Sequence, residues 1–246
     1  WAGFTTATFD ARKGKTSVKE NILRQINDQI HSIPKSFNVH AKIKKIFTAR
    51  HESVASGSGI DWATAESLAF STLLKEGYGV RLSGQDTGRG TFSQRHAVLY
   101  DQENENRFVP LRHFTKKQGH FEIVDSFLSE FGVLGFEYGY SQADPQTLVV
   151  WEAQFGDFAN GAQIIIDQFI TTGERKWLRM SGITLLLPHG HEGQGPEHTS
   201  SRLERFLQMC AEDNIQVANC TSPANYYHIL RRQLHREFRK PLILLT

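Results

Sequence analysis

Two polar stretches hold most of the side chains in this chain that could do chemistry. Residues 151–163 read Trp-Glu-Ala-Gln-Phe-Gly-Asp-Phe-Ala-Asn-Gly-Ala-Gln, and residues 187–198 read Leu-Pro-His-Gly-His-Glu-Gly-Gln-Gly-Pro-Glu-His. Each stretch follows an apolar run that we predict to be a buried strand. Ligands of open α/β sheets bind beyond the carboxyl ends of the strands. Both stretches are therefore candidates for the wall of an active site.

The second stretch is rich in groups that bind metals or exchange protons, namely His189, His191, Glu192, Glu197 and His198. Histidines with a carboxylate can hold zinc, so a metal-dependent hydrolase is one hypothesis. The loop lacks a His-Glu-x-x-His motif, however, and its glycines suit close backbone approach to a ligand. We therefore predict a substrate-contacting loop without metal ligands. A structural loop whose histidines only satisfy backbone groups remains an alternative.

Glu130 and a pair of phenylalanines are the next candidates. Glu130 follows Ser129 and opens an apolar helix, where a carboxylate is usually a charge that stabilises the helix start. The functional alternative is a desolvated carboxylate that shares a proton with a ring nitrogen. Phe155 and Phe158 flank Gly-Asp between a strand and a helix, where they either belong to the core or form a platform for a flat cofactor ring. The glycine-rich loop 83–90 lacks Gly-x-Gly-x-x-Gly spacing, so it predicts the lining of a site or a subunit interface rather than a dinucleotide site.

Composition excludes several classes of protein. The 246 residues are 39% hydrophobic and 22% charged with a net charge of +2, which predicts neither nucleic-acid nor membrane binding. No apolar run approaches the ~20 residues of a membrane span. The two cysteines, Cys210 and Cys220, exclude a disulfide scaffold and indicate an intracellular, reducing compartment. We expect both to be core thiols, and we expect the chain, which begins without Met, to be part of a longer protein.

Periodicity predicts two regions. Residues 17–33 and 41–49 are expected to be helices, and residues 53–59 a linker, so that 1–59 form a helical extension. Residues 60–246 are expected to form one α/β domain with three α/β/α layers and a mostly parallel sheet, because several strands are continuous apolar runs. The expected strands lie near 80–82, 97–100, 122–124, 148–151, 183–187, 215–218 and 242–245. The expected helices lie near 61–76, 130–142, 159–171, 200–214 and 223–238.

Three long motifs in this order carry a family resemblance. Residues 129–140 (Ser-Glu-Phe-Gly-Val-Leu-Gly-Phe-Glu-Tyr-Gly-Tyr), 151–163 and 187–198 together resemble the pyrimidine-binding, transketolase-like domain of the thiamine-diphosphate-dependent 2-oxoglutarate dehydrogenase component. Residues 81–86 and 90–96 fit the same family. The resemblance runs from about residue 60 to residue 246 and is less distinctive before it.

The resemblance implies a cofactor and roles for individual residues. Thiamine diphosphate would be bound with Glu130 against a pyrimidine nitrogen, a contact that promotes the imino tautomer of the cofactor. Phe158, with Phe155 beside it, would stack on the pyrimidine ring. His198, and next His189, would contact the substrate. Gln85 and His96 are weaker candidates for lining the site.

The resemblance also implies an activity and partners. The family decarboxylates 2-oxoglutarate oxidatively and passes the succinyl unit to lipoamide. It works as a homodimer, docked on a dihydrolipoyl succinyltransferase core with dihydrolipoyl dehydrogenase. Its magnesium and the cofactor diphosphate are bound through a Gly-Asp-Gly motif of another domain, and this sequence has no such motif. We therefore expect residues 1–246 alone to be inactive. The alternatives are 2-oxoadipate or another 2-oxo acid as substrate, and a non-catalytic dimerisation or interaction domain.

Overall fold

A parallel six-stranded sheet forms the centre of the structure. The computed structural model describes residues 1–7, 13–191 and 194–246. In these ranges the sheet has the strand order β4-β1-β5-β6-β8-β7, and every adjacent pair is parallel. The predicted parallel sheet is confirmed. In sheet order the strands are β4 (Phe121–Asp125), β1 (Gly79–Gly84), β5 (Thr147–Glu152), β6 (Thr184–Leu187), β8 (Leu242–Leu245) and β7 (Gln216–Asn219).

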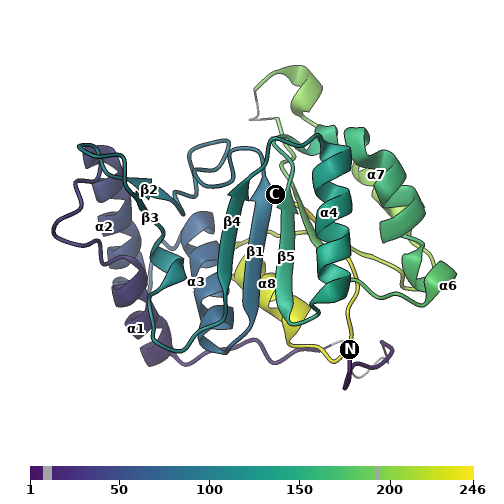
Figure 1. Cartoon of the computed structure of the whole chain (residues 1–246), viewed down its shortest axis with the longest axis horizontal. Helices are drawn as coiled ribbons and strands as arrows, with labels where there is room; N and C mark the ends of the chain where they lie inside the picture. Colours follow the sequence, from purple (N-terminus) through teal and green to yellow (C-terminus); the bar gives the residue numbers. More distant parts are fainter. Residues whose placement is uncertain (8–12, 192–193) are drawn as a thin grey trace.

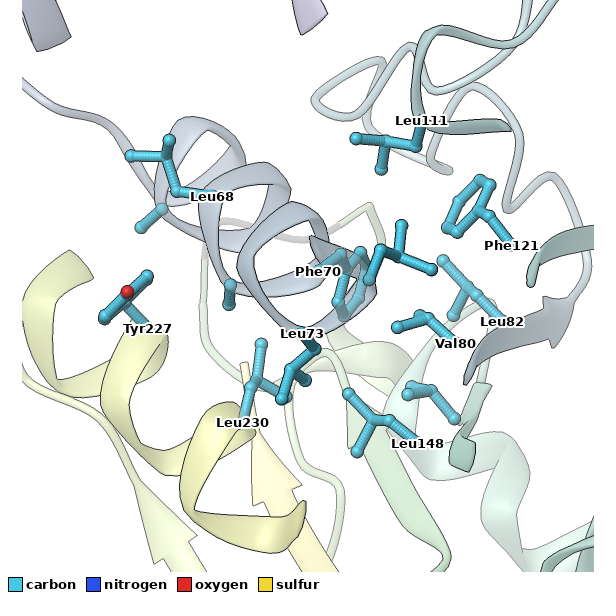
Figure 2. Packing of buried hydrophobic residues seen from close by; sticks show 14 of the residues in the cluster. Leu68, Phe70, Leu73, Val80, Leu82, Leu111, Phe121, Leu148, Tyr227 and Leu230 are labelled. Carbon is cyan, nitrogen blue, oxygen red and sulfur yellow. The ribbon is translucent and has the colours of Figure 1, made fainter. Parts of the chain in front are cut away.

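Alternate strand residues enter two different hydrophobic cores. Val80 and Leu82 of β1 and Leu148 of β5 pack in one core with helix residues such as Leu73 and Leu230 (Figure 2). The residues between them in the strands, such as Val149, Trp151 and Ile243, pack in the core on the opposite face. Both faces of the sheet are covered, which explains why the strands are continuous apolar runs rather than alternating ones.

Helices cover both faces of the sheet, so the predicted three-layer α/β/α fold is confirmed. The helices α3 (Trp62–Lys75) and α8 (Pro223–Leu234) supply one outer layer. The helices α4 (Glu130–Ala143) and α7 (Leu203–Gln208) contribute to the other (Figure 1). Asp61 and Ser129 cap α3 and α4 by accepting backbone N–H groups at 2.7 and 3.4 Å.

The segment between β5 and β6 is not the single helix predicted over 159–171. It contains a 3-10 helix (Gly156–Ala162), α5 (Gln163–Ile165), a π-helical turn (Ile166–Ile170) and α6 (Gly173–Trp177). Thr171 donates both its N–H and its hydroxyl to the carbonyl of Ile166 at 3.0 Å, which fixes the wide turn. Turns of this kind are frequent at functional sites.

Two further predictions near the sheet are wrong in part. The helix predicted over 200–214 is only α7, because Arg202 and then Glu212 take left-handed conformations with φ of 55° and 52°. The strand predicted near 97–100 is β2 (Leu99–Tyr100), which pairs antiparallel with β3 (Arg107–Phe108) outside the main sheet.

Cys210 is exposed, so it is not the core thiol that we expected, and Cys220 is half-buried.

The first part of the chain is helical, as predicted, with α1 (Glu20–Ile30) and α2 (Ala41–Ser56). The predicted linker at 53–59 is wrong over its first half. There α2 continues to Ser56 and ends at Gly57, whose φ of 73° suits glycine. Ile26 and Ile30 of α1 pack in the same core as α3, so the extension shares the core of the domain. Among the described residues, no helix is long and apolar enough to cross a membrane.

His31 at the end of α1 provides a test of this packing. Burial lowers the pKa of His31 from its ordinary value of 6.5 to about 4. Between these values the unfolded chain binds the proton and the folded chain does not, so stability is lost as the pH falls through this range. The loss amounts to on the order of 2 kcal/mol at pH 4.5.

Urea unfolding at pH 7.5 and 4.5 measures this loss. We expect the His31→Gln variant to lose about 2 kcal/mol less than the parent on acidification, because Gln does not titrate. His120→Gln is the matched control, since the His120 side chain is exposed. Equal losses in the parent and in His31→Gln would contradict the packing of His31.

Candidate functional site

The predicted site residues follow four neighbouring strands of the sheet. Gln85 follows β1, Glu130 follows β4, and Phe155 and Phe158 follow β5. The loop 188–198, which carries His189 and His198, follows β6. The sheet order β4-β1-β5-β6 makes these four strands adjacent. From β1 the sheet extends through β4 on one side and through β5 on the other, so this edge includes the topological switch point where α/β sheets bind ligands (Figure 1).

Glu130 lies between the loop after β1 and the 3-10 helix after β5. It is the first residue of α4 and is half-buried. The Nε2 atom of Gln85 donates to Glu130 Oε1 over a long 3.5 Å. A Cβ atom at Gly161 would lie 3.1 Å from Glu130 Oε2, so the glycine leaves this oxygen room. A carboxylate accepts about four hydrogen bonds, and Glu130 therefore keeps capacity for a ligand.

His198 and the aromatic residues after β5 form one cluster. The rings of Phe155 and His198 are stacked with centroids 4.2 Å apart at 14°. The ring of Phe158 lies 5.1 Å from His198. Phe92 adds an edge contact to Phe155 at 5.6 Å. The structure thus brings together three of the predicted residues and adds Phe92. The available signal for Phe92 was its position two residues after the glycine-rich loop 83–90.

A buried carboxylate orients His198. The Nδ1 atom of His198 lies 3.0 Å from Oδ1 of Asp157, and Asp157 is buried. The Nδ1–H group therefore donates to Asp157, and in the neutral ring the acceptor is Nε2, which lies 3.7 Å from Oε1 of Glu197. A histidine held by a carboxylate in this way can accept and return a proton. Sequence reasoning did not select Asp157, although it lies between the two predicted phenylalanines.

His189 is held in the opposite tautomer. Its Nδ1 atom accepts the N–H of Ser201 at 3.0 Å, so the proton of the neutral ring is on Nε2. His191 is exposed, and Glu192 lies outside the described residues. Within 1–7, 13–191 and 194–246, no group of three or more His, Cys, Asp or Glu side chains could hold a metal ion. His96 has a left-handed φ of 52°, and burial and the nearby Arg50 lower its pKa.

The edge of the sheet contains a cavity of about 560 Å³, and only some of the predicted site residues line it. Phe155, His189 and His198 line it, and its volume is typical of small-molecule sites. Glu130, Gln85, Phe158 and His96 do not line it. The side chains that complete much of its wall are Trp62, Phe92, Glu66, Arg95, Glu152 and Tyr226.

A buried ionic cluster lies against this cavity. Arg95 Nε is 2.6 Å from Glu66 Oε1, and Arg95 Nη1 is 2.6 Å from Glu152 Oε2. The hydroxyl of Tyr226 donates to Glu66 at 2.7 Å. Burial alone would lower the pKa of Arg95, but the two carboxylates outweigh it and raise this pKa well above its ordinary value. Sequence reasoning missed the cluster because its members are far apart in the chain.

Comparison with known proteins identifies relatives of the chain. The family model of the transketolase pyrimidine-binding domain matches residues 58–246. The chain is also similar to the 2-oxoglutarate dehydrogenase E1 components of Brucella canis, Brucella suis and Brucella abortus, with 62% identity to each. These matches cover 100% of this chain and 25% of each relative, so the chain spans a quarter of their length.

The ionic cluster predicts a large effect of one substitution. Arg95→Met leaves the buried carboxylates of Glu66 and Glu152 without their cation, which should lower the free energy of unfolding by about 3–5 kcal/mol. Arg89→Met is the matched control. The Arg89 side chain is 52% exposed, and its ion pair with Asp86 is longer, at 3.4 Å. We expect this control to change stability by less than about 1 kcal/mol. Urea unfolding at pH 7 measures both, and similar losses would contradict the role of the cluster.

Proposed function

This chain belongs to the family of transketolase pyrimidine-binding domains, and from that premise we propose that it provides the pyrimidine-binding side of a thiamine diphosphate site. The whole protein is proposed to be a 2-oxo acid dehydrogenase component that acts on 2-oxoglutarate. The observation that carries the proposal is that Glu130, Gln85 and the Phe155–His198 stack all follow the carboxyl ends of adjacent strands. The relatives named 2-oxoglutarate dehydrogenase E1 component support the choice of substrate.

The residues around Glu130 fit the pyrimidine half of thiamine diphosphate. Glu130 is half-buried, keeps free acceptor capacity and lies beside Gly161, which leaves space at its carboxylate. Its carboxylate would hold a proton shared with a pyrimidine nitrogen, and the ring of Phe158 would pack on the flat heterocycle. When bound, the cofactor supplies an electron sink for decarboxylation.

The two histidines have complementary roles in this proposal. His189 offers its Nε2–H group as a donor because Nδ1 is already occupied by the N–H of Ser201. A donor of this kind suits the carboxylate or the carbonyl oxygen of a 2-oxo acid. His198 offers Nε2 as an acceptor because Asp157 takes its Nδ1–H. The pair can therefore bind an anionic substrate and move one proton.

Other parts of the whole protein must supply what this chain does not carry. We place the diphosphate and magnesium on a domain outside residues 1–246, because the sequence lacks Gly-Asp-Gly. Succinyl transfer to lipoamide on a succinyltransferase core, with dihydrolipoyl dehydrogenase, belongs to the same proposal. So do a location in a bacterial cytoplasm or mitochondrial matrix and the division into an extension (1–59) and a domain (60–246). Residues 1–246 alone are proposed to be inactive.

Exposed apolar side chains beside Glu130 support a homodimer. Phe127 is 102% exposed and Phe131 is 50% exposed, and α5, which contacts α4, carries Ile164 at 56% exposed. Apolar side chains gathered in this way on a soluble surface mark an interaction site. We propose that a second copy of the chain covers them. The same patch is what favours the alternative of a non-catalytic dimerisation domain.

The Glu130→Gln substitution separates these alternatives. In the full-length protein with thiamine diphosphate and magnesium, we expect turnover of 2-oxoglutarate to fall at least ~100-fold, because the amide cannot share the proton. The control is Glu204→Gln, an exposed residue of α7. Circular dichroism verifies that both variants fold. Near-normal turnover of Glu130→Gln would refute the role of Glu130.

The proposed dimer contact is tested by Phe131→Asp in the full-length protein. A buried carboxylate in an apolar contact should weaken dimerisation at least ~10-fold, measured by sedimentation velocity over a concentration series. Leu207→Asp is the control, since Leu207 is 54% exposed on α7. If both variants dimerise as tightly as the parent, the second copy does not cover this patch.

A further inference from the structure

A second cavity lies apart from the site described above. Its volume is about 580 Å³, and it lies between the last turn of α1 and the segment 107–114. It shares no lining residue with the cavity at His189 and His198. Its lining residues are Gln29, Ser32, Arg107, Phe108, Val109, Pro110, Arg112, His113 and Phe114. The proposed function assigns it no role.

The charged side chains that line this cavity are all basic. Arg107, Arg112 and His113 line it, and no carboxylate does. Between Glu105 and Glu122 the sequence contains no Asp or Glu at all. In the part of the chain that the structure describes, neither Arg107 nor Arg112 pairs with a carboxylate, and Arg107 lies over the ring of Tyr100 at 5.9 Å. Two guanidinium groups therefore keep their donors free for an oxyanion.

The wall of this cavity is held in place before any ligand binds. Val109 and Pro110 are buried, and the ring of Phe108 packs against Phe37 at 5.7 Å. The side chain of Gln118 fastens the following loop, donating to the carbonyl of Leu111 at 2.8 Å and accepting the N–H of Thr115 at 3.1 Å. A site formed in advance loses less free energy to ordering when a ligand binds.

Gln29 and Ser32 add polar side chains to the wall on the side of α1. Both are uncharged, so they leave the positive charge of Arg107 and Arg112 uncompensated within the cavity.

We propose that this cavity binds a small organic anion that carries a phosphate or carboxylate group on a short carbon skeleton. The anionic group is held by Arg107 and Arg112, and the carbon skeleton lies against Phe108 and Phe114. Because the cavity shares no residue with the proposed thiamine diphosphate site, this binding does not depend on the proposed function.

Isothermal titration of the full-length protein tests the proposal with three probes. Glycerol 3-phosphate and glycerate carry the two kinds of anionic group, and glycerol carries none. We expect one of the anions to bind with measurable heat and glycerol to give none. The stronger of the two anions identifies the preferred group.

Arg112→Gln shows whether the binding occurs in this cavity. The loss of one charge-assisted contact should weaken binding of the preferred anion about tenfold. Arg175→Gln is the matched control, because the Arg175 side chain is 86% exposed on α6 and lies outside the cavity. The proposal is overturned if neither anion binds, or if Arg112→Gln binds the preferred anion as tightly as Arg175→Gln does.

Discussion

The carboxyl edge of the sheet depends on the buried pairing of Arg95 with Glu66 and Glu152. Arg95 joins α3, which carries Glu66, to the end of β5, which carries Glu152, and it also donates to the carbonyl of Thr87 in the loop after β1 at 3.0 Å. A charge buried without such partners costs several kcal/mol, so the three segments are stable only together. The loops that follow β1 and β5, which carry Gln85 and Phe155, begin beside this ionic cluster.

The parallel sheet then brings distant residues to one edge. Glu130 and His198 are far apart in sequence, but their strands β4 and β6 lie within four adjacent strands. Carboxyl ends of parallel strands meet at the same edge, so residues that are far apart along the chain follow one edge of the sheet. The proton-sharing groups of the proposed site, Glu130, Asp157 and His198, thus come from three separate connections of one sheet.

Local sequence patterns were sufficient for the regular parts of the fold. The strands predicted near 148–151 and 242–245 coincide with β5 and β8, and the helix predicted from residue 130 is α4. These segments are apolar runs or capped helices, whose signals are local. Glu130, Phe155 and His198 were candidates from their residue types and their positions after predicted strands. Their roles come from the family resemblance and remain predictions.

Tertiary contacts decided what the sequence pattern could not predict. The π-helical turn before Thr171 depends on hydrogen bonds that no propensity scale describes. The ionic cluster of Arg95 joins residues from separate elements, and the Asp157–His198 bond joins two loops. Periodicity is a property of single segments, so pairs of this kind become visible only when the segments are assembled.

The most direct test of the central claim is 2-oxo acid-dependent ferricyanide reduction by the full-length protein. It would be measured with 2-oxoglutarate, 2-oxoadipate and pyruvate, each with and without thiamine diphosphate and magnesium. The account predicts a clear preference for 2-oxoglutarate that disappears without the cofactor. Preference for another acid would keep the cofactor site and change the substrate. No cofactor-dependent reduction with any of the three acids would contradict the account.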